Sequence, residues 1–157
     1  MEYPIKAAFL INFARFVEWP GDAFASPTSS FVIAVAGSPT MVGILLDLAK
    51  AERIGDRVVE VVAVTGATPP ARCHILYIAS SVESNRLGKL LAPPRRSGVL
   101  TVGDSEMFVS RGGIIRFFVA DNRVRFEISL DNAGRSALRI GSQLLQLAKL
   151  VGRPREP

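Results

Sequence analysis

The chain has 157 residues, 48% of them hydrophobic, and a mean hydropathy of +0.28, which fits one compact domain with a sizeable core. No apolar run approaches the roughly 20 residues of a membrane span, because Lys6, Asn12 and Arg15 interrupt the longest candidate. We therefore expect a soluble domain over residues 1–152, without membrane insertion, and a frayed tail over 153–157.

The net charge of +5 is unevenly spread along the chain. Through Glu52 there are 3 Lys and Arg residues against 5 Asp and Glu residues, and beyond it there are 16 against 9. A basic later part can face nucleic acid, anionic lipid or an acidic protein surface. No aromatic-interleaved RNA-binding motif accompanies it, so we interpret it as a solvated basic face and expect no nucleic-acid partner.

The opening segment has the spacing of an amphipathic helix, with Pro4 near its first turn and Pro20-Gly21 after its end. One stripe holds its large apolar side chains, namely Ile5, Phe9, Phe13 and Phe16, widened by Leu10 and Val17. A second strip is small and apolar where a surface helix would be charged, and consists of Ala7, Ile11 and Ala14. One layer cannot easily bury both sides of a terminal helix, so we expect this strip to form a two-fold homodimer.

The body then alternates strands with helices. A continuous apolar run predicts a buried parallel strand at 31–36, and further strands are predicted at 58–64, 75–79 and 99–102. Helical spacing predicts helices at 41–51 and 81–91, the second capped by Ser81, and a short helix at 105–110. Residues 114–119 and 123–129, joined by Asp121-Asn122, read as a hairpin, and Asp131 caps a last helix whose apolar stripe runs to Val151.

This alternation predicts an α/β fold. We expect a three-layer sandwich of the flavodoxin-like or Rossmann-like kind. Its mostly parallel sheet is covered by helices on both faces and carries an antiparallel hairpin at one edge.

Four motifs in order carry a resemblance that covers essentially the whole chain. They are Tyr3-Pro4-Ile5-Lys6-Ala7-Ala8-Phe9 with Glu18-Trp19-Pro20; Cys73-His74-Ile75-Leu76-Tyr77-Ile78; Leu100-Thr101-Val102-Gly103-Asp104; and Gly112-Gly113 leading to Arg125-Phe126-Glu127-Ile128. The sequence resembles the YfiR family, small periplasmic proteins that repress a membrane-bound diguanylate cyclase.

The resemblance implies a non-enzymatic protein that binds the periplasmic sensing domain of an inner-membrane diguanylate cyclase and holds it inactive. Cyclic di-GMP and biofilm formation would fall, and an outer-membrane or peptidoglycan-associated lipoprotein would relieve the repression. The family's leader lies upstream of the Tyr-Pro motif, so we expect a periplasmic chain whose leader has been removed. Some relatives carry cysteine pairs and are described as dimers, whereas Cys73 is alone here and is predicted to be a buried, inert thiol.

Polar residues that follow the predicted strands could line the edge where open α/β sheets bind ligands. They include Ser38, Ser80 and Asp104. The glycine spacing of a dinucleotide site and a P-loop are both absent from the sequence. Two readings remain: ordinary strand-to-helix turns, or a crevice for a small solute in a sensing domain that serves a kinase or transporter.

Catalytic and metal constellations fail on geometry. His74 precedes the third predicted strand and Ser80 follows it, and five residues of strand separate such groups by roughly 16 Å. General-base contact needs about 3 Å. One His and one Cys are too few ligands for a His/Cys zinc site. We therefore expect no enzyme activity, no cofactor and no metal.

Three surfaces remain as candidates for binding a partner protein. Glu18-Trp19 places a large aromatic beside a carboxylate, although Trp19 could simply cap the core. Arg125 and Glu127 should point outward from an edge strand, either toward a partner or to prevent aggregation. On the last helix, Arg139 and Gln143 lie on the polar face, which could equally be solvated.

Overall fold

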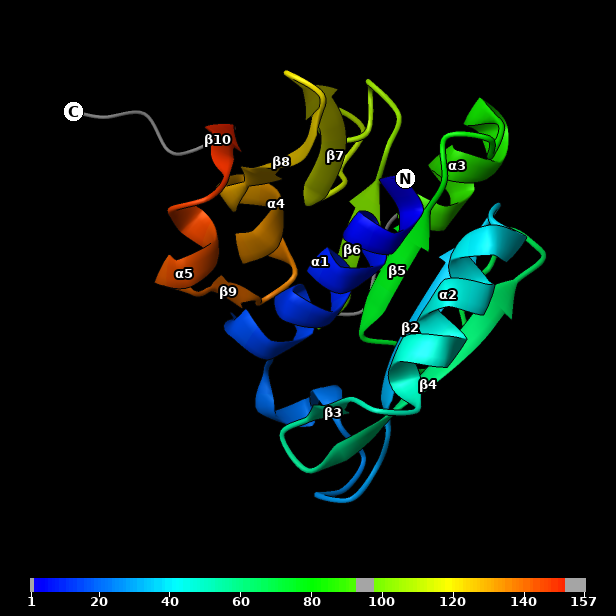
Figure 1. Ribbon diagram of the computed structural model, residues 1–157, viewed down its shortest axis with the longest axis vertical. Helices are drawn as coiled ribbons and strands as arrows, with labels where there is room; N and C mark the ends of the chain where they lie inside the picture. The colour runs from blue at the N-terminus through cyan, green and yellow to red at the C-terminus, as the bar shows by residue number, and fades with distance from the viewer. Residues whose placement is uncertain (1, 93–97, 152–157) are drawn as a thin grey trace.

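A computed structural model describes residues 2–92 and 98–151, and Figure 1 shows one curled sheet with helices packed against it. Eight strands form this sheet in the order β10-β8-β7-β6-β5-β2-β4-β3. Their bounds are β2 Phe31–Ala36, β3 Arg53–Ile54, β4 Arg57–Val64, β5 Ile75–Ile78, β6 Leu100–Gly103, β7 Ile115–Ala120, β8 Arg123–Ser129 and β10 Lys149–Val151. The ladders of β4, β2, β5, β6 and β7 are parallel, and β7 pairs with β8 as an antiparallel hairpin.

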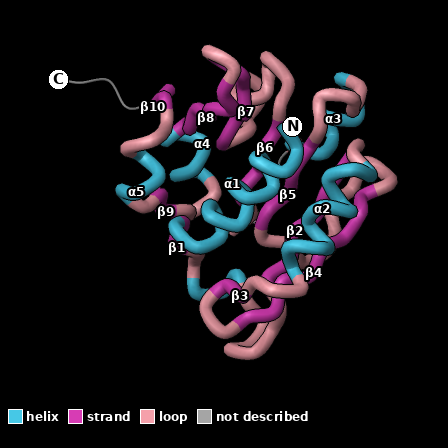
Figure 2. Tube along the Cα trace, in the orientation of Figure 1, coloured by secondary structure: helices cyan, strands magenta, loops and turns pink. Residues whose placement is uncertain are grey.

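The five parallel strands follow the flavodoxin-like order, in which the first strand, β2, lies between the second, β4, and the third, β5. The helices are α1 Glu2–Phe16, α2 Pro39–Ala49, α3 Ser84–Leu91, α4 Leu130–Arg135 and α5 Ser142–Leu145, with a 3-10 turn η1 at Gly21–Ala23. A separate ribbon joins β1, Val17–Glu18, to β9, Arg139–Ile140, and Figure 2 shows it below α5. The predicted three-layer α/β fold with its hairpin is confirmed.

Two apolar clusters explain the layers. On one face, alternate residues of the central strands, such as Ile33 and Tyr77, pack with α1 and α2. On the other face, their neighbours in sequence, such as Ala34 and Ile78, pack with α3 and with Phe108. Because these strands are buried on both faces, they read in the sequence as continuous apolar runs.

The opening helix is present and buries Leu10 and Phe13 of the predicted stripe, but it also buries the second strip and leaves the two ends of the stripe exposed. Ala7, Ile11 and Ala14 are 0%, 4% and 2% exposed within the core, whereas Ile5 and Phe16 are 47% and 37% exposed. The small side chains allow the helix to pack closely on the sheet, and Phe13 lies 5.0 Å from Phe126 between ring centroids. The strip predicted to form a homodimer is therefore covered within its own chain.

The predicted last helix is wrong. The segment divides into α4, β9, α5 and β10, and Ala137 has a left-handed φ of 59°, which a continuous helix excludes. Residues 105–110 form turns in place of a helix, and Glu83, not Ser81, occupies the cap position of α3. The predicted tail at 153–157 lies outside the described residues.

Candidate functional site

The turns after β2 and β5 pack closely on each other, and a pocket of about 400 Å³ lies beside them at the ends of β2 and β4, lined in part by Gly37, Ser38 and Arg86. Ser81 Oγ donates a hydrogen bond to Gly37 O at 2.7 Å, and a Cβ on Gly37 would lie 2.5 Å from Val82 Cγ2. Ser38 is buried, and its hydroxyl accepts from Met41 N at 3.0 Å as the N-cap of α2. The polar atoms predicted to line a crevice therefore serve turns and caps.

Asp104 belongs to a different cluster, at the end of β6. Lys6 Nζ lies 3.0 Å from Asp104 Oδ1 and 3.0 Å from Glu2 Oε1, and the Tyr77 hydroxyl donates to Asp104 Oδ2. Burial opposes the charge on Lys6, but the charges and hydrogen bonds of Asp104 and Glu2 together outweigh it and hold the pKa of Lys6 above its usual value. Ser80 is exposed and makes no contact with this cluster among the described interactions, so the three predicted crevice residues do not form one site.

His74 belongs to an aromatic cluster at the opposite end of β5. Val32 N donates to His74 Nδ1 at 3.0 Å, which places the proton of the neutral ring on Nε2, 2.8 Å from Ala23 O. The ring stacks on Phe24 with centroids 4.2 Å apart. Burial, helped by the charges of nearby arginines, lowers the pKa of His74 against the effect of its bond to Ala23. A buried, neutral and fully bonded imidazole stabilises the fold and is not placed as a general base.

Trp19 joins the same cluster. Its ring meets Phe31 edge-on at 5.3 Å, and its Nε1 donates to Ala14 O at 3.4 Å. The side chain is half-buried. This geometry supports the alternative in which Trp19 caps the core.

The other predicted partner residues fall on two surfaces. Glu18 and Arg139 face each other across β1 and β9 with an Nη1–Oε1 distance of 3.8 Å, and exposed Gln143 lies on neighbouring α5. Arg125 is exposed on β8, opposite Phe118 and away from the β1–β9 ribbon. The structure thus brings Glu18, Arg139 and Gln143 together and keeps Arg125 apart.

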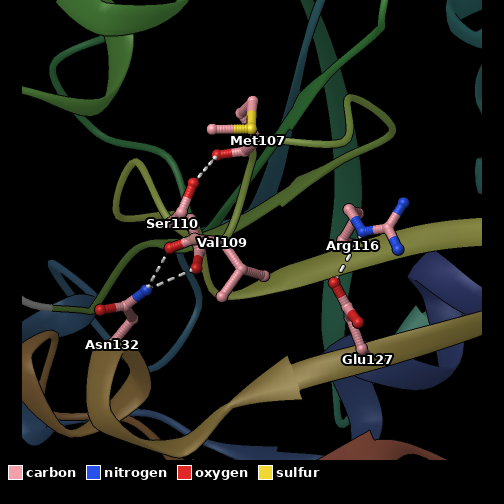
Figure 3. A network of polar contacts seen from close by, with 7 residues as sticks. Met107, Val109, Ser110, Arg116, Glu127 and Asn132 are labelled. Atoms are coloured by element: carbon pink, nitrogen blue, oxygen red, sulfur yellow. Dashed lines mark hydrogen bonds and ion pairs between the residues drawn. The ribbon is translucent and has the colours of Figure 1, made fainter. Parts of the chain in front are cut away.

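The structure corrects the prediction that Glu127 points outward from an edge strand. Glu127 is 8% exposed, and its Oε2 accepts from Arg116 Nε at 2.6 Å (Figure 3). The strand that carries it is not an edge, because β10 pairs with β8 on its free side. Glu127 therefore cannot point freely toward solvent as the sequence pattern indicated.

The base of the hairpin is tied to the turns before it (Figure 3). Asn132 Nδ2 donates to Val109 O at 3.1 Å and to Gly113 O at 2.8 Å, and Asn132 N donates to Ser129 Oγ at 3.1 Å. These bonds join the start of β7 to the end of β8. The two ends of the hairpin are therefore held together at its base.

The sequence model of the YfiR/HmsC-like family matches residues 3–149. The chain belongs to this family. A search of curated proteins found no match. The YfiR/HmsC-like family is periplasmic, regulatory and non-catalytic, so membership supports a periplasmic regulator of diguanylate cyclase as the general function. Among its described helices, this YfiR/HmsC-like chain has none with the length and apolar character needed to cross a membrane.

Sequence reasoning missed Arg116, Phe118 and Lys149, which share the face of Arg125. The signal was present for two of them. A two-residue Asp121-Asn122 turn opposes Ala120 to Arg123, and counting back pairs Phe118 with Arg125 and Arg116 with Glu127. No such signal existed for Lys149, because the sequence pattern predicted a helix where the structure has β10.

Proposed function

We infer that this chain represses a membrane-bound diguanylate cyclase by binding its periplasmic domain, which lowers cyclic di-GMP and biofilm formation. The family match over residues 3–149 is the observation that carries the proposal. The site geometry supports it, since the polar residues considered for catalysis cap helices, close turns or form buried pairs.

Repression of this kind follows from linkage. A protein that binds only the inactive conformation of the cyclase shifts the population by its differential affinity for the two conformations. A lipoprotein that competes for the same chain would restore activity by removing it from the cyclase.

The test is to export the chain to the periplasm of a strain that lacks its own copy and carries a membrane-bound diguanylate cyclase from the same organism. Cellular cyclic di-GMP should fall. The matched control is the same cyclase without its periplasmic domain, whose activity should not respond. Unchanged cyclic di-GMP with the intact cyclase, at verified periplasmic levels of the chain, contradicts the proposal.

A further inference from the structure

One face of the β7–β8 hairpin combines cations with an aromatic ring. Successive residues of a strand alternate between faces and directly paired residues share a face. The ladder therefore places six side chains together: Arg116, Phe118, Arg123, Arg125, Glu127 and, through the pairing of β10 with β8, Lys149. We call this set the basic hairpin face. The helix that packs on the hairpin, α1, lies against the other face, where Phe9 contacts Phe117 and Phe126.

The basic hairpin face has four cations and one carboxylate. Arg123, Arg125 and Lys149 are exposed and make no ion pair within residues 2–92 and 98–151. Glu127 is engaged by Arg116 Nε, and the terminal nitrogens of Arg116 point away from it (Figure 3). The surface therefore presents uncompensated positive charge and guanidinium donors that have no acceptor among the described residues.

The face is also preorganised. Arg116 is fixed by Glu127 and lies 5.2 Å from the centroid of the half-buried Phe118 ring. Asp121 and Asn122 have φ values of 54° and 61°, as in the tight turns that fix hairpin register. Side chains held in place before binding lose less entropy when a partner orders them.

We propose that the basic hairpin face is where this chain binds an acidic segment of its partner protein. Guanidinium groups recognise carboxylates with paired parallel hydrogen bonds, and Phe118 offers apolar contact between the charges. This rests on the proposed function, which it deepens by naming the surface and the chemistry of the cyclase segment. A protein segment fits better than an anionic bilayer, because Phe118 and the Arg116 guanidinium fixed against it offer apolar contact and directed hydrogen bonds side by side, which suits a peptide with acidic and apolar side chains.

The test measures binding of the purified periplasmic domain of a membrane-bound diguanylate cyclase from the same organism to the parent chain and to Arg125→Glu. We expect at least tenfold weaker affinity, mainly through slower association, because like charges now meet. Arg53→Glu is the matched control, since Arg53 is exposed on β3 at the opposite edge of the sheet. It should bind as the parent does. Raising the salt concentration should weaken binding of the parent more than binding of Arg125→Glu.

A second variant, Arg123→Glu, guards against a local effect of Arg125→Glu on the buried Arg116–Glu127 pair. Both variants should keep the parent's melting temperature to within a few degrees. If Arg123→Glu and Arg125→Glu both fold and bind the cyclase domain as tightly as the parent, the proposal is overturned, while repression by the parent would leave the proposed function standing.

Binding of the parent chain to vesicles with and without anionic lipid tests whether the basic hairpin face binds lipid headgroups in place of a protein segment. The proposal predicts that neither kind of vesicle binds the parent at physiological salt. Binding to anionic vesicles that Arg125→Glu abolishes, with cyclase binding unaffected, would assign the face to lipid and overturn the proposal. If the parent itself neither represses nor binds the cyclase domain, the proposed function fails first.

Discussion

His74 gives the sharpest test of how this fold is held together. His74→Phe keeps an aromatic ring between Phe24 and Phe31 but removes both ring nitrogens. Val32 N then loses its partner in a region where His74 itself is fully buried, while Ala23 O keeps the hydrogen bond from Arg72 Nη1 at 3.1 Å. An unpaired buried polar group costs about 1–3 kcal/mol, so the free energy of unfolding should fall by about 1–3 kcal/mol at pH 7.5.

The same residue makes stability depend on pH. Its folded pKa is lowered below 6.5, the value of the unfolded chain. Below pH 6.5, His74 therefore binds a proton in the unfolded chain but not in the folded chain. Its contribution to the free energy of unfolding falls as the pH drops toward the folded pKa. The loss between pH 6.5 and 5.5 amounts to at most about 1.4 kcal/mol.

Urea unfolding at pH 7.5, 6.5 and 5.5 measures both effects. Trp19 is the single tryptophan and lies 6.1 Å from His74 between ring centroids, so its fluorescence reports on this cluster. The chain has one histidine, so the stability difference between parent and His74→Phe should shrink as the pH falls. Equal stability of the two proteins at pH 7.5, or a difference that stays constant across this range, would refute the reasoning.

Three further predictions concern packing and the hairpin. Ile11→Glu places a carboxylate in the core and should lower the free energy of unfolding by roughly 3–5 kcal/mol. Asn12→Glu, at the exposed next position, should leave the free energy of unfolding unchanged. Light scattering should show no change from dimer to monomer for Ile11→Glu. Gly103→Ala puts a Cβ 2.5 Å from the Phe108 ring and should cost about 1–3 kcal/mol in thermal unfolding, a result that an unchanged melting temperature would contradict. Glu127→Gln weakens its bond to Arg116 and should cost about 1–3 kcal/mol, and a double-mutant cycle with Arg116→Gln should show coupling; additive effects would mean that the pair contributes nothing.

The order of strands and helices was predictable because it depends on local patterns. Buried parallel strands need continuous apolar runs, and Phe31–Ala36 and Ile75–Ile78 supply them. The hairpin was predictable because Asp121 and Asn122 tolerate positive φ better than most residues. Such features can be read without knowing what lies across the fold.

The face of α1 was not predictable in this way. Phe9, Phe13 and Phe16 have helical spacing, and so do Ala7, Ile11 and Ala14, but the fold buries all of the second set and leaves Phe16 exposed. Lys6 falls on the buried face, where a cation is costly unless it is paired, and its partner Asp104 lies 98 residues away. Only the tertiary fold reveals that pairing.

The last helix failed for a different reason. Its apolar spacing was suitable, but Gly134 and Gly141 lie within the predicted span, and each disfavours a helix by about 1 kcal/mol. Pairing of β9 with β1 and of β10 with β8 then satisfies the backbone in another way. The two glycines argued against a continuous helix, and the prediction gave them too little weight against the apolar stripe.

The motifs that identify the family are largely engaged within the fold. Trp19 packs near His74, which bonds across to the loop before β2, and Asp104 pairs with Lys6. A variant at any of these positions that loses repression therefore reports first on stability, because their contacts are internal. Arg123 and Arg125 have no such internal commitment among the described residues, so a loss of repression there, at unchanged melting temperature, reports on the partner. Experiments on this family's binding surfaces are best interpreted with that division in view.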